Sequence, residues 1–335
     1  MNLWFGSKKY SLFNINNYKI DTSKFGSLLH DFEDELEQQF AKYVGAKYAC
    51  VANSASSLLE LCLAKVVSMC PVEFLNVYKL EIPSMIPIAV SNLVHNSHIP
   101  AKWEDNVDWV GRAYTLYDTK KALSRFKNHI EPYKIIDSAQ EVRKNQFSED
   151  ASDSDIMIFS LYPTKPVGGM DGGVMVSNDK SKIDYYRAVT HLGVASVNNK
   201  SWERRLIFPG WKMHPNSAQC YVALKNLEKL EEKNFRLDEI KEKYNQAFEY
   251  KNTSRHLYRI NVKDKNEFIA NMKSFGIETG FHYGPAHLNP FYNIESVGSM
   301  QRTLRASAKT VSIPFNEKLT NRDVKFIIDK VNKYK

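Results

Sequence analysis

Near the start of the chain, apolar residues recur at the four-residue spacing of one helix face: Phe32, Leu36, Phe40 and Val44. Acidic residues crowd the first turn of this segment, and Gly45 stands just past its end. Both features are typical of helix boundaries, because acidic side chains favour the positive end of the helix dipole and glycine often follows the last turn. The pattern therefore predicts an amphipathic helix over residues 32–44.

Short apolar runs, each ending at a polar residue or a turn, predict strands over residues 48–52, 80–82, 134–136, 155–159 and 174–176. After the first run, the polar turn 53–57 leads into a helix that reaches about Met69 and is apolar nearly all round, as in a buried helix. A strand, a tight turn and a buried helix indicate an α/β domain. Ligands bind beyond the carboxyl ends of strands in such sheets. We therefore expect three segments to converge: residues 54–57, 137–140 and 160–165.

The last third of the chain has a different pattern. A long charged helix is predicted over residues 226–248, followed by a strand over 256–262, a helix over 267–275 and a final helix over 320–331. These elements predict a smaller α+β domain over residues 226–335. Residues 1–225 then form a large domain that begins with an irregular segment, and the two domains share the long helix.

Composition and charge exclude several classes of protein. With 335 residues, 43% of them hydrophobic, the chain is typical of a globular protein, and no apolar stretch approaches the ~20 residues that span a bilayer. The N-terminus lacks the pattern of a signal peptide, and none of the four cysteines forms a C-x-x-C pair, so we expect a cytoplasmic protein with buried thiols. The net charge of +8 is spread along the chain rather than interleaved with aromatics. It predicts no nucleic-acid or membrane partner, and at most an attraction for a phosphorylated ligand.

One glycine-rich stretch, FSLYPTKPVGGMDGG over residues 159–173, carries candidate chemistry. Lys165 precedes a proline and so cannot continue a helix. Two Gly-Gly pairs follow within eight residues, and glycine lets the backbone approach a ligand closely. A single lysine is usually a solvated surface charge, but this one follows a buried-type strand and comes five residues after Ser160.

This stretch resembles the cofactor-lysine motif of the DegT/DnrJ/EryC1/StrS family, the sugar aminotransferases among the fold-type-I enzymes that use pyridoxal 5'-phosphate (PLP). In that family the lysine forms a Schiff base with PLP and the serine binds the cofactor phosphate. The resemblance implies these roles for Lys165 and Ser160. It also implies the α/β fold of that class, in which a large domain with a mixed, mostly parallel sheet precedes a smaller C-terminal α+β domain.

The sequence Ile-Ile-Asp-Ser-Ala-Gln over residues 135–140 resembles the strand-end motif of the same family. The resemblance implies that Asp137 pairs with the pyridine nitrogen of PLP and that Gln140 lies against the ring. A carboxylate at that nitrogen keeps it protonated, so that the ring can accept electrons. Without this resemblance, Asp137 could simply cap a helix.

Residues 53–57, Asn-Ser-Ala-Ser-Ser, resemble the phosphate-binding turn Asn-Ser-Gly-Thr-Ala of the family. The resemblance implies that Ser56 and Ser57 bind the cofactor phosphate, for which the free N–H groups at a helix N-terminus are suited. Ala55 replaces the family glycine. The alternative is ordinary helix capping by serine.

Other matches concern the substrate and a second subunit. Lys212 stands where the family has an asparagine that reaches the phosphate of the neighbouring subunit, which implies a homodimer with a shared site; His214 replaces the family arginine. His282 and His287 lie in a further matching segment and are candidate substrate contacts, or else packed or exposed histidines.

His95 and His98 have metal-like spacing but no carboxylate or thiolate beside them, so we read them as a loop and expect no metal.

Two departures from the family pattern bear on the substrate. Pro87 stands where an aromatic or similarly flat residue usually covers the cofactor ring, so ring stacking is weakened or comes from elsewhere. The stretch from Trp103 to Asp137 is also shorter than in the family. Neither departure removes a residue that is predicted to hold PLP.

The sequence thus predicts a PLP-dependent aminotransferase. By the resemblance, its small-molecule substrates are an amino acid, glutamate, and a keto sugar linked to a nucleotide. The alternatives are a non-catalytic or regulatory relative, or another PLP reaction such as dehydration. Relatives that dehydrate sugars have histidine in place of the lysine, which argues against dehydration here. A dehydrogenase would need a G-x-G-x-x-G motif after the first strand, which this chain lacks.

Overall fold

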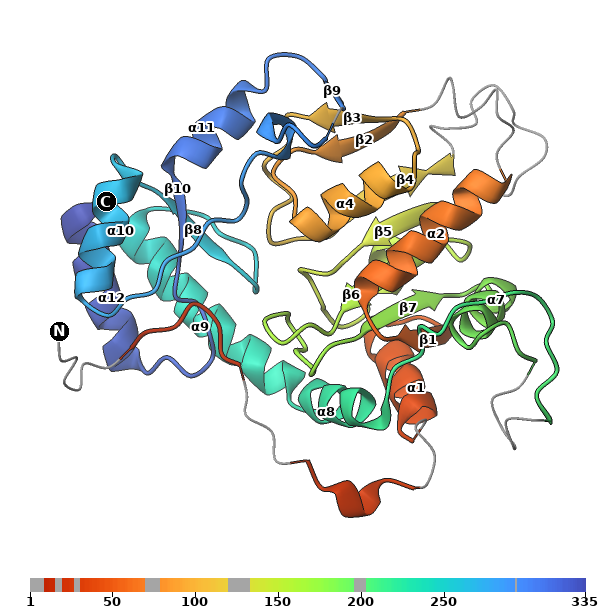
Figure 1. Cartoon of the computed structure of the whole chain (residues 1–335). Coiled ribbons are helices and arrows are strands. Elements are labelled where there is room, and N and C mark those ends of the chain that lie inside the picture. The colour runs from red at the N-terminus through yellow and green to blue at the C-terminus, as the bar shows by residue number, and fades with distance from the viewer. Residues whose placement is uncertain are drawn as a thin grey trace, which may run out of the picture.

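A five-stranded sheet in the order β1-β7-β6-β5-β4 forms the centre of the computed structural model (Figure 1). Its strands are β1 (Tyr48–Ala52), β4 (Tyr114–Asp118), β5 (Lys134–Asp137), β6 (Ile156–Ser160) and β7 (Gly173–Ser177). The structure describes residues 9–15, 20–26, 31–69, 79–119, 133–195, 203–292 and 294–335.

The central sheet is mixed. β5 and β6 pair in parallel, whereas β1–β7, β7–β6 and β5–β4 are antiparallel pairs. Three of the five strands, β1, β5 and β6, therefore run in one direction, as most strands of the expected sheet do, although only one pairing within the sheet is parallel. Because these three strands share a direction, their carboxyl ends lie at the same edge.

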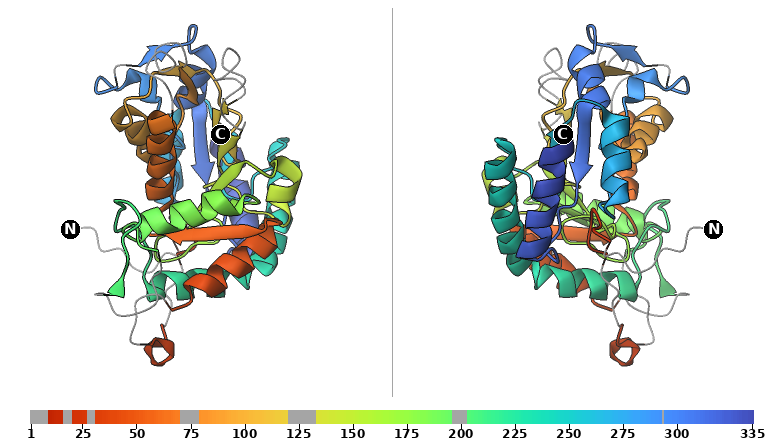
Figure 2. Two further views of the ribbon diagram at one scale, coloured as in Figure 1. Left: turned by 90° about the vertical axis from the view of Figure 1, so that its right-hand side faces the viewer. Right: turned by 90° about the vertical axis from the view of Figure 1, so that its left-hand side faces the viewer.

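Helices cover both faces of this sheet, as the α/β class requires. On one face, α2 packs on β6 and β7 and α7 packs on β1 and β7, around Cys50, Ile158 and Met175. On the other face, α1 and α8 pack around Val51, Phe159 and Val174, the alternate residues of the strands (Figure 2). The helices of this unit are α1 (Glu33–Val44), α2 (Ala55–Met69), α6 (Gln146–Asp150), α7 (Lys180–Thr190) and α8 (Ser217–Leu227).

A second, parallel sheet of three strands lies beside the first. It contains β2 (Leu80–Pro83), β3 (Ala101–Glu104) and β9 (Glu295–Ser296), and α4 (Ile88–Asn96) connects β2 to β3. The strand predicted over residues 80–82 therefore exists but pairs outside the central sheet. The interpretation of His95 as part of a loop was wrong, because it lies in the last turn of α4, whose buried Val90 and Val94 stabilise the helix.

The C-terminal unit has its own core, formed by residues such as Tyr244, Tyr258, Phe268 and Ile327 around the antiparallel pair β8–β10. Its elements are α9 (Leu230–Phe248), β8 (Tyr258–Asn261), α10 (Lys265–Ser274), α11 (Gln301–Lys309), β10 (Thr310–Ile313) and α12 (Asn321–Tyr334). Two 3₁₀ turns, η1 (Thr22–Lys24) and η3 (Ala286–Leu288), complete the described elements. No described helix is long and apolar enough to cross a membrane.

The single helix predicted over residues 226–248 is interrupted. α8 ends at Leu227 and α9 begins at Leu230, and both leucines are buried against the large unit. From Leu237 onward, α9 packs in the C-terminal core instead. The interruption thus lies where the chain passes from one core to the other. A domain boundary between residues 225 and 226 stays a prediction, since β9 returns to the sheet of β2 and β3.

Candidate active site

The loop after β6 presents Lys165 from a tight turn. The Gly169 N–H donates a hydrogen bond to the Leu161 carbonyl (2.7 Å), and the Lys165 N–H donates one to the Tyr162 carbonyl (2.9 Å). Gly168 has φ of +67°, and a Cβ there would lie 2.9 Å from the Pro163 carbonyl oxygen. The first Gly-Gly pair is therefore needed to fold this turn.

One side chain from α8 and one from α9 donate hydrogen bonds to the backbone of the same loop. The Lys233 ammonium of α9 donates to the Pro166 carbonyl (2.7 Å), next to the candidate lysine, and the Asn226 amide of α8 donates to the Gly168 carbonyl. Burial lowers the pKa of Lys165, and the nearby Asp137 carboxylate opposes that shift. Burial also lowers the pKa of Lys233. A lysine in this environment gives up its proton more easily than one in water.

Asp137 is the last residue of β5 and is 4% exposed. Its Oδ1 accepts a hydrogen bond from the Ala139 N–H (2.9 Å), and its Oδ2 accepts one from the Tyr114 hydroxyl (2.9 Å) on β4. Burial raises the pKa of this carboxyl, while these two donors and the Lys165 charge lower it. No helix starts at Asp137, so capping does not explain its position; the structure brings it within electrostatic reach of Lys165.

The turn between β1 and α2 is held by serine hydroxyls. Ser54 Oγ accepts from the Ser57 N–H (3.0 Å), and the Ser57 hydroxyl donates to Asn53 Oδ1 (2.7 Å). Ser57 thus takes part in ordinary capping, which leaves its predicted role at a phosphate open. Ser56 is half-buried, and its hydroxyl has no hydrogen bond within the described residues.

Ser160 and this serine turn meet at one edge of the sheet. Ser160 pairs with Gly173 of β7, and Gly173 pairs with Ala52 at the end of β1. A Cβ on Gly173 would lie 2.4 Å from the Ala55 nitrogen, so only glycine lets β7 pass so close to the start of α2. The free N–H groups at this helix start, with the Ser56 and Ser160 side chains nearby, fit a phosphate group.

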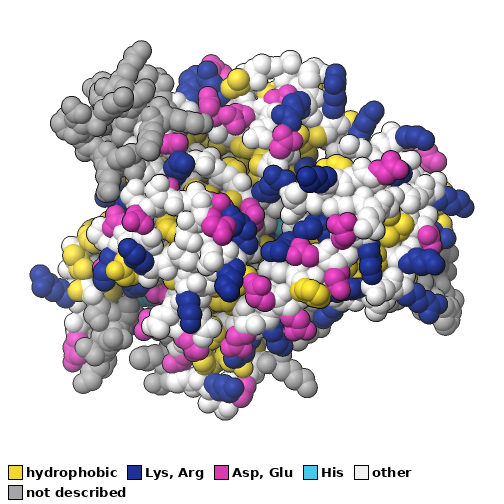
Figure 3. All heavy atoms as spheres, turned by 180° about the vertical axis from the view of Figure 1, so that it is seen from behind, with side chains coloured by type: hydrophobic (Ala, Val, Ile, Leu, Met, Phe, Trp, Pro, Cys, Tyr) yellow, Lys and Arg dark blue, Asp and Glu magenta, His cyan; other side chains and the backbone are white. Residues whose placement is uncertain are grey.

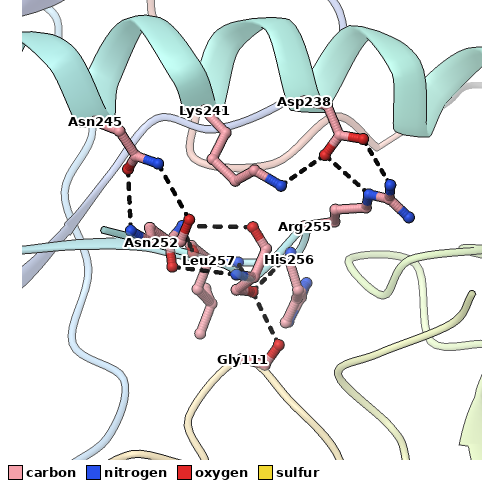
Figure 4. A network of polar contacts seen from close by, with 9 residues as sticks. Gly111, Asp238, Lys241, Asn245, Asn252, Arg255, His256 and Leu257 are labelled. Atoms are coloured by element: carbon pink, nitrogen blue, oxygen red, sulfur yellow. Dashed lines mark hydrogen bonds and ion pairs between the residues drawn. The ribbon is translucent and has the colours of Figure 1, made fainter. Parts of the chain in front are cut away.

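Gln140 is buried and tied to a distant segment. Its Oε1 accepts from the Gly111 N–H (3.0 Å), and the Gly111 carbonyl accepts from the Ser254 hydroxyl (2.9 Å). Ser254 Oγ in turn accepts from the His256 N–H (3.0 Å) (Figure 4). On the other side, α9 anchors this segment through Asp238, which pairs with Arg255 at 2.6 Å. The strand-end motif is thereby connected to the C-terminal unit.

His256, Tyr114 and Tyr283 belong to the site but were not found from the sequence. Burial lowers the pKa of His256 strongly, and the charge of Lys165 lowers it further. Burial raises the pKa of Tyr283, and the Asp137 charge adds to that shift. Tyr283 stands in the same matching segment as His282 but was not singled out as a site residue. No local motif identifies Tyr114 or His256, because their proximity to the site comes from contacts between distant segments.

The two candidate substrate histidines lie in different surroundings. His282 Nδ1 is 2.8 Å from Ser312 Oγ, and burial, with the Lys165 charge, lowers its pKa to about 4. His282 is therefore neutral near pH 7 and close to the candidate lysine. His287 Nδ1 is 2.7 Å from the buried Ser84 Oγ, so it fastens η3 to the turn after β2.

The remaining candidates are placed as follows. The Lys212 side chain is exposed, and the contact of Lys212 with a second subunit stays a prediction. The carbonyl of the next residue, Met213, accepts a hydrogen bond from the Asn53 N–H (2.7 Å) at the serine turn. Pro87 precedes α4. The ring of Tyr114, whose hydroxyl bonds to Asp137, lies 4.6 Å from the Trp109 ring, which in turn stacks on Tyr283 at 6.3 Å. Part of the shortened stretch 103–137, residues 120–132, lies outside the described residues.

A family model described as the DegT/DnrJ/EryC1/StrS aminotransferase family matches residues 150–332, more than half of the chain. The chain belongs to this family. Its members are PLP-dependent aminotransferases, so the protein is an enzyme of that class with PLP as cofactor.

Relatives of known sequence cover most of the chain. A UDP-4-amino-4,6-dideoxy-N-acetyl-beta-L-altrosamine transaminase of Campylobacter jejuni is 26% identical over 333 residues, 88% of each chain. The spore coat polysaccharide biosynthesis protein SpsC of Bacillus subtilis is 24% identical over 348 residues, 89% of this chain and 88% of that protein.

Solved structures confirm the fold-type-I architecture. The PLP form of a putative sugar aminotransferase of Streptococcus pneumoniae matches with a TM-score of 0.77 at 17% identity, over 98% of both chains. Helicobacter pylori PseC, an aminotransferase involved in the biosynthesis of pseudoaminic acid, matches with a TM-score of 0.72 at 17% identity, over 97% of this chain and 99% of that one.

The substitution Tyr114→Phe removes one of the two hydrogen-bond donors that lower the pKa of Asp137. The pKa of the carboxyl should then rise. The acidic limb of the kcat–pH profile should move to higher pH, because the role predicted for Asp137 at the cofactor nitrogen needs the ionised form. We expect kcat to fall about tenfold, as for a lost hydrogen bond to a charged group. Tyr258→Phe is the control, since it removes a 2.9 Å hydrogen bond to Asn245 without touching Asp137. An unmoved acidic limb in Tyr114→Phe would contradict the prediction.

Proposed function

We propose that this aminotransferase moves an amino group from glutamate to the keto group of a nucleotide-linked sugar, with PLP bound through Lys165. The observation that carries the proposal is the meeting of Lys165, Asp137 and the serine turn at one edge of the central sheet. The printed activity of the Campylobacter jejuni relative, a UDP-amino-sugar transaminase, supports a sugar nucleotide as substrate.

PLP, when bound, supplies an acceptor for the electron pair that is released at the substrate Cα. In this proposal the Lys165 Nζ takes the Cα proton and later returns a proton during transfer. A general base must be neutral to accept a proton, and burial lowers the pKa of Lys165 in that direction. The two hydrogen-bonded oxygens of Asp137 fix the carboxylate whose charge is to hold the protonated ring nitrogen.

The phosphate of the cofactor would bind at the start of α2, with Ser56 and Ser160 as donors, Ser57 beside them and Gln140 behind the ring. Lys212 is proposed to reach the phosphate of a partner subunit in a homodimer, and His282 and His287 to contact substrate. Lys and Arg side chains surround a hollow near the middle of the rear face, a favourable setting for an anionic substrate (Figure 3). Nothing in the proposal requires a nucleic acid or a membrane, and we place the enzyme in the cytoplasm.

The test uses purified protein loaded with PLP and given L-glutamate. The first half-reaction should bleach the long-wavelength absorbance of bound PLP and release 2-oxoglutarate in equal amount. Adding a UDP-4-keto sugar should restore the absorbance and yield a UDP-amino sugar by mass spectrometry. A free keto sugar is the control acceptor. Bleaching by glutamate without product from any nucleotide-linked keto sugar would overturn the acceptor, and no bleaching would overturn the donor.

A further inference from the structure

Two adjoining hollows form one groove along β8, and Val107 and Asp108 of the large unit also line one of them. Each has a volume of about 480 Å³, and they share Tyr250, Asn261 and Lys309. One hollow lies over Ile260 and Val262, and the other extends toward α11. Within the described residues, β8 pairs only with β10, so its other edge is free. We call this feature the β8 groove.

The β8 groove is strongly cationic. Only one carboxylate side chain lines it, that of Asp108, and Arg302 already pairs with it at 2.6 Å. The cationic side chains that line the groove are those of Arg259, Lys263, Arg302, Arg305, Lys309 and Lys335. Apart from Arg302, none of them has an ion pair within the described residues. Like charges gathered in this way repel each other until an anion binds between them.

Arg259 forms the inner wall of this groove and reaches the active site. Its guanidinium donates to two backbone carbonyls, those of Val107 (3.1 Å) and His282 (3.4 Å), and burial lowers its pKa. His282 is the histidine whose pKa responds to Lys165. The nearby Asp108 carboxylate acts on Arg259 only at longer range and is itself paired with Arg302. A half-buried arginine without an ion pair of its own is costly in the free protein, which points to a ligand that completes its charge.

The two halves of the groove differ in character. Arg302, Arg305 and Lys309 are three and four residues apart on α11, which puts them on one helix face. At the junction of the two halves stands Tyr250, with 46% of its surface exposed, and the half beyond it has an apolar floor. Guanidinium and ammonium groups bind phosphates, and an exposed aromatic ring beside an apolar floor accepts a flat base.

We propose that the β8 groove binds a nucleoside diphosphate, with the phosphates over Arg305 and Lys309 and the base against Tyr250. The ligand is either the carrier half of a sugar nucleotide or a free nucleotide that occupies the groove by itself. The first case deepens the proposed function and rests on it, whereas the groove and its ligand class do not depend on that proposal.

The experiment measures UDP binding to the PLP-loaded enzyme by calorimetry, so that it does not depend on turnover. The double variant Arg305→Ala/Lys309→Ala should raise the Kd for UDP about tenfold or more, because two charge-assisted contacts are lost. The matched control is Arg322→Ala/Lys325→Ala, an exposed arginine and lysine of α12 that line neither hollow. Tyr250→Ala should weaken UDP more than it weakens pyrophosphate, and added salt should weaken both.

Further probes separate the two sources of the ligand. If UDP-N-acetylglucosamine displaces UDP and responds to the same double variant, the groove takes the carrier of a sugar nucleotide. If UDP alone binds and responds, the groove takes a free nucleotide. No UDP binding at millimolar concentration, an equal loss in the control variant, or binding of UDP no tighter than pyrophosphate would overturn the proposal. A failed amino transfer with intact UDP binding would count against the proposed function only.

Discussion

Lys165→Ala is expected to abolish covalent attachment of PLP and to lower kcat by about 10²–10⁴-fold, the usual contribution of a positioned acid–base group. The expectation rests on the folded loop that presents Lys165 beside Asp137 and on the burial that lowers the pKa of its amine. Borohydride reduction followed by intact-mass measurement checks the attachment directly. The wild-type mass should increase by one reduced PLP, and the mass of the variant should not change.

Lys144→Ala is the matched control, because Lys144 is exposed in the turn that follows the Asp137 motif. It should retain PLP attachment and kcat. PLP that remains covalently attached in Lys165→Ala would show that another amine carries the cofactor. Lys233, which is half-buried and bonded to the neighbouring Pro166, would then be the first candidate.

Asp137→Ala is expected to leave PLP covalently attached and to lower kcat by about 10²–10³-fold, the cost of losing one preorganised electrostatic group. Asp137 is 4% exposed, and its carboxylate is fixed by hydrogen bonds from Ala139 and Tyr114. Solvent therefore cannot substitute for the lost negative charge in the variant. The measurements are kcat for the glutamate half-reaction and PLP content by reduction and mass.

A cofactor analogue separates the chemistry of Asp137 from a role in folding. PLP methylated at the ring nitrogen carries a permanent positive charge and does not need a carboxylate to stay charged. It should restore part of the activity of Asp137→Ala but not that of Lys165→Ala. Equal failure of both variants with the analogue, at an unchanged melting temperature, would contradict the proposed role of Asp137.

The parts of the site that the sequence predicts are those in which neighbouring residues determine the local structure. The Lys165 turn depends on its own prolines and on Gly168, and Asp137 follows a run of buried residues that can only be a strand. Both segments were therefore found from their motifs, and β1, β5 and β6 have nearly the expected bounds. The roles of these residues toward PLP stay predictions.

The parts that the sequence does not predict depend on distant segments. Tyr114 reaches Asp137 only because β4 pairs antiparallel with β5. His256 is held by a chain of hydrogen bonds that runs through Gly111 to Gln140, and the charge of Lys165 lowers its pKa. The interruption between α8 and α9 was missed for the same reason, since the charged pattern continues while the packing partner changes. Pattern periodicity contains no information about which core a helix face will contact.

The position of α9 has a mechanical consequence. Through Lys233 the helix is bonded to the carbonyl next to Lys165, and through Asp238 it is bonded to the segment that carries His256. A rotation of the C-terminal unit about residues 228–229 must therefore either pull the lysine turn with it or break the Lys233 bond. The position of the Lys165 turn is thus mechanically coupled to the orientation of the C-terminal unit through one helix.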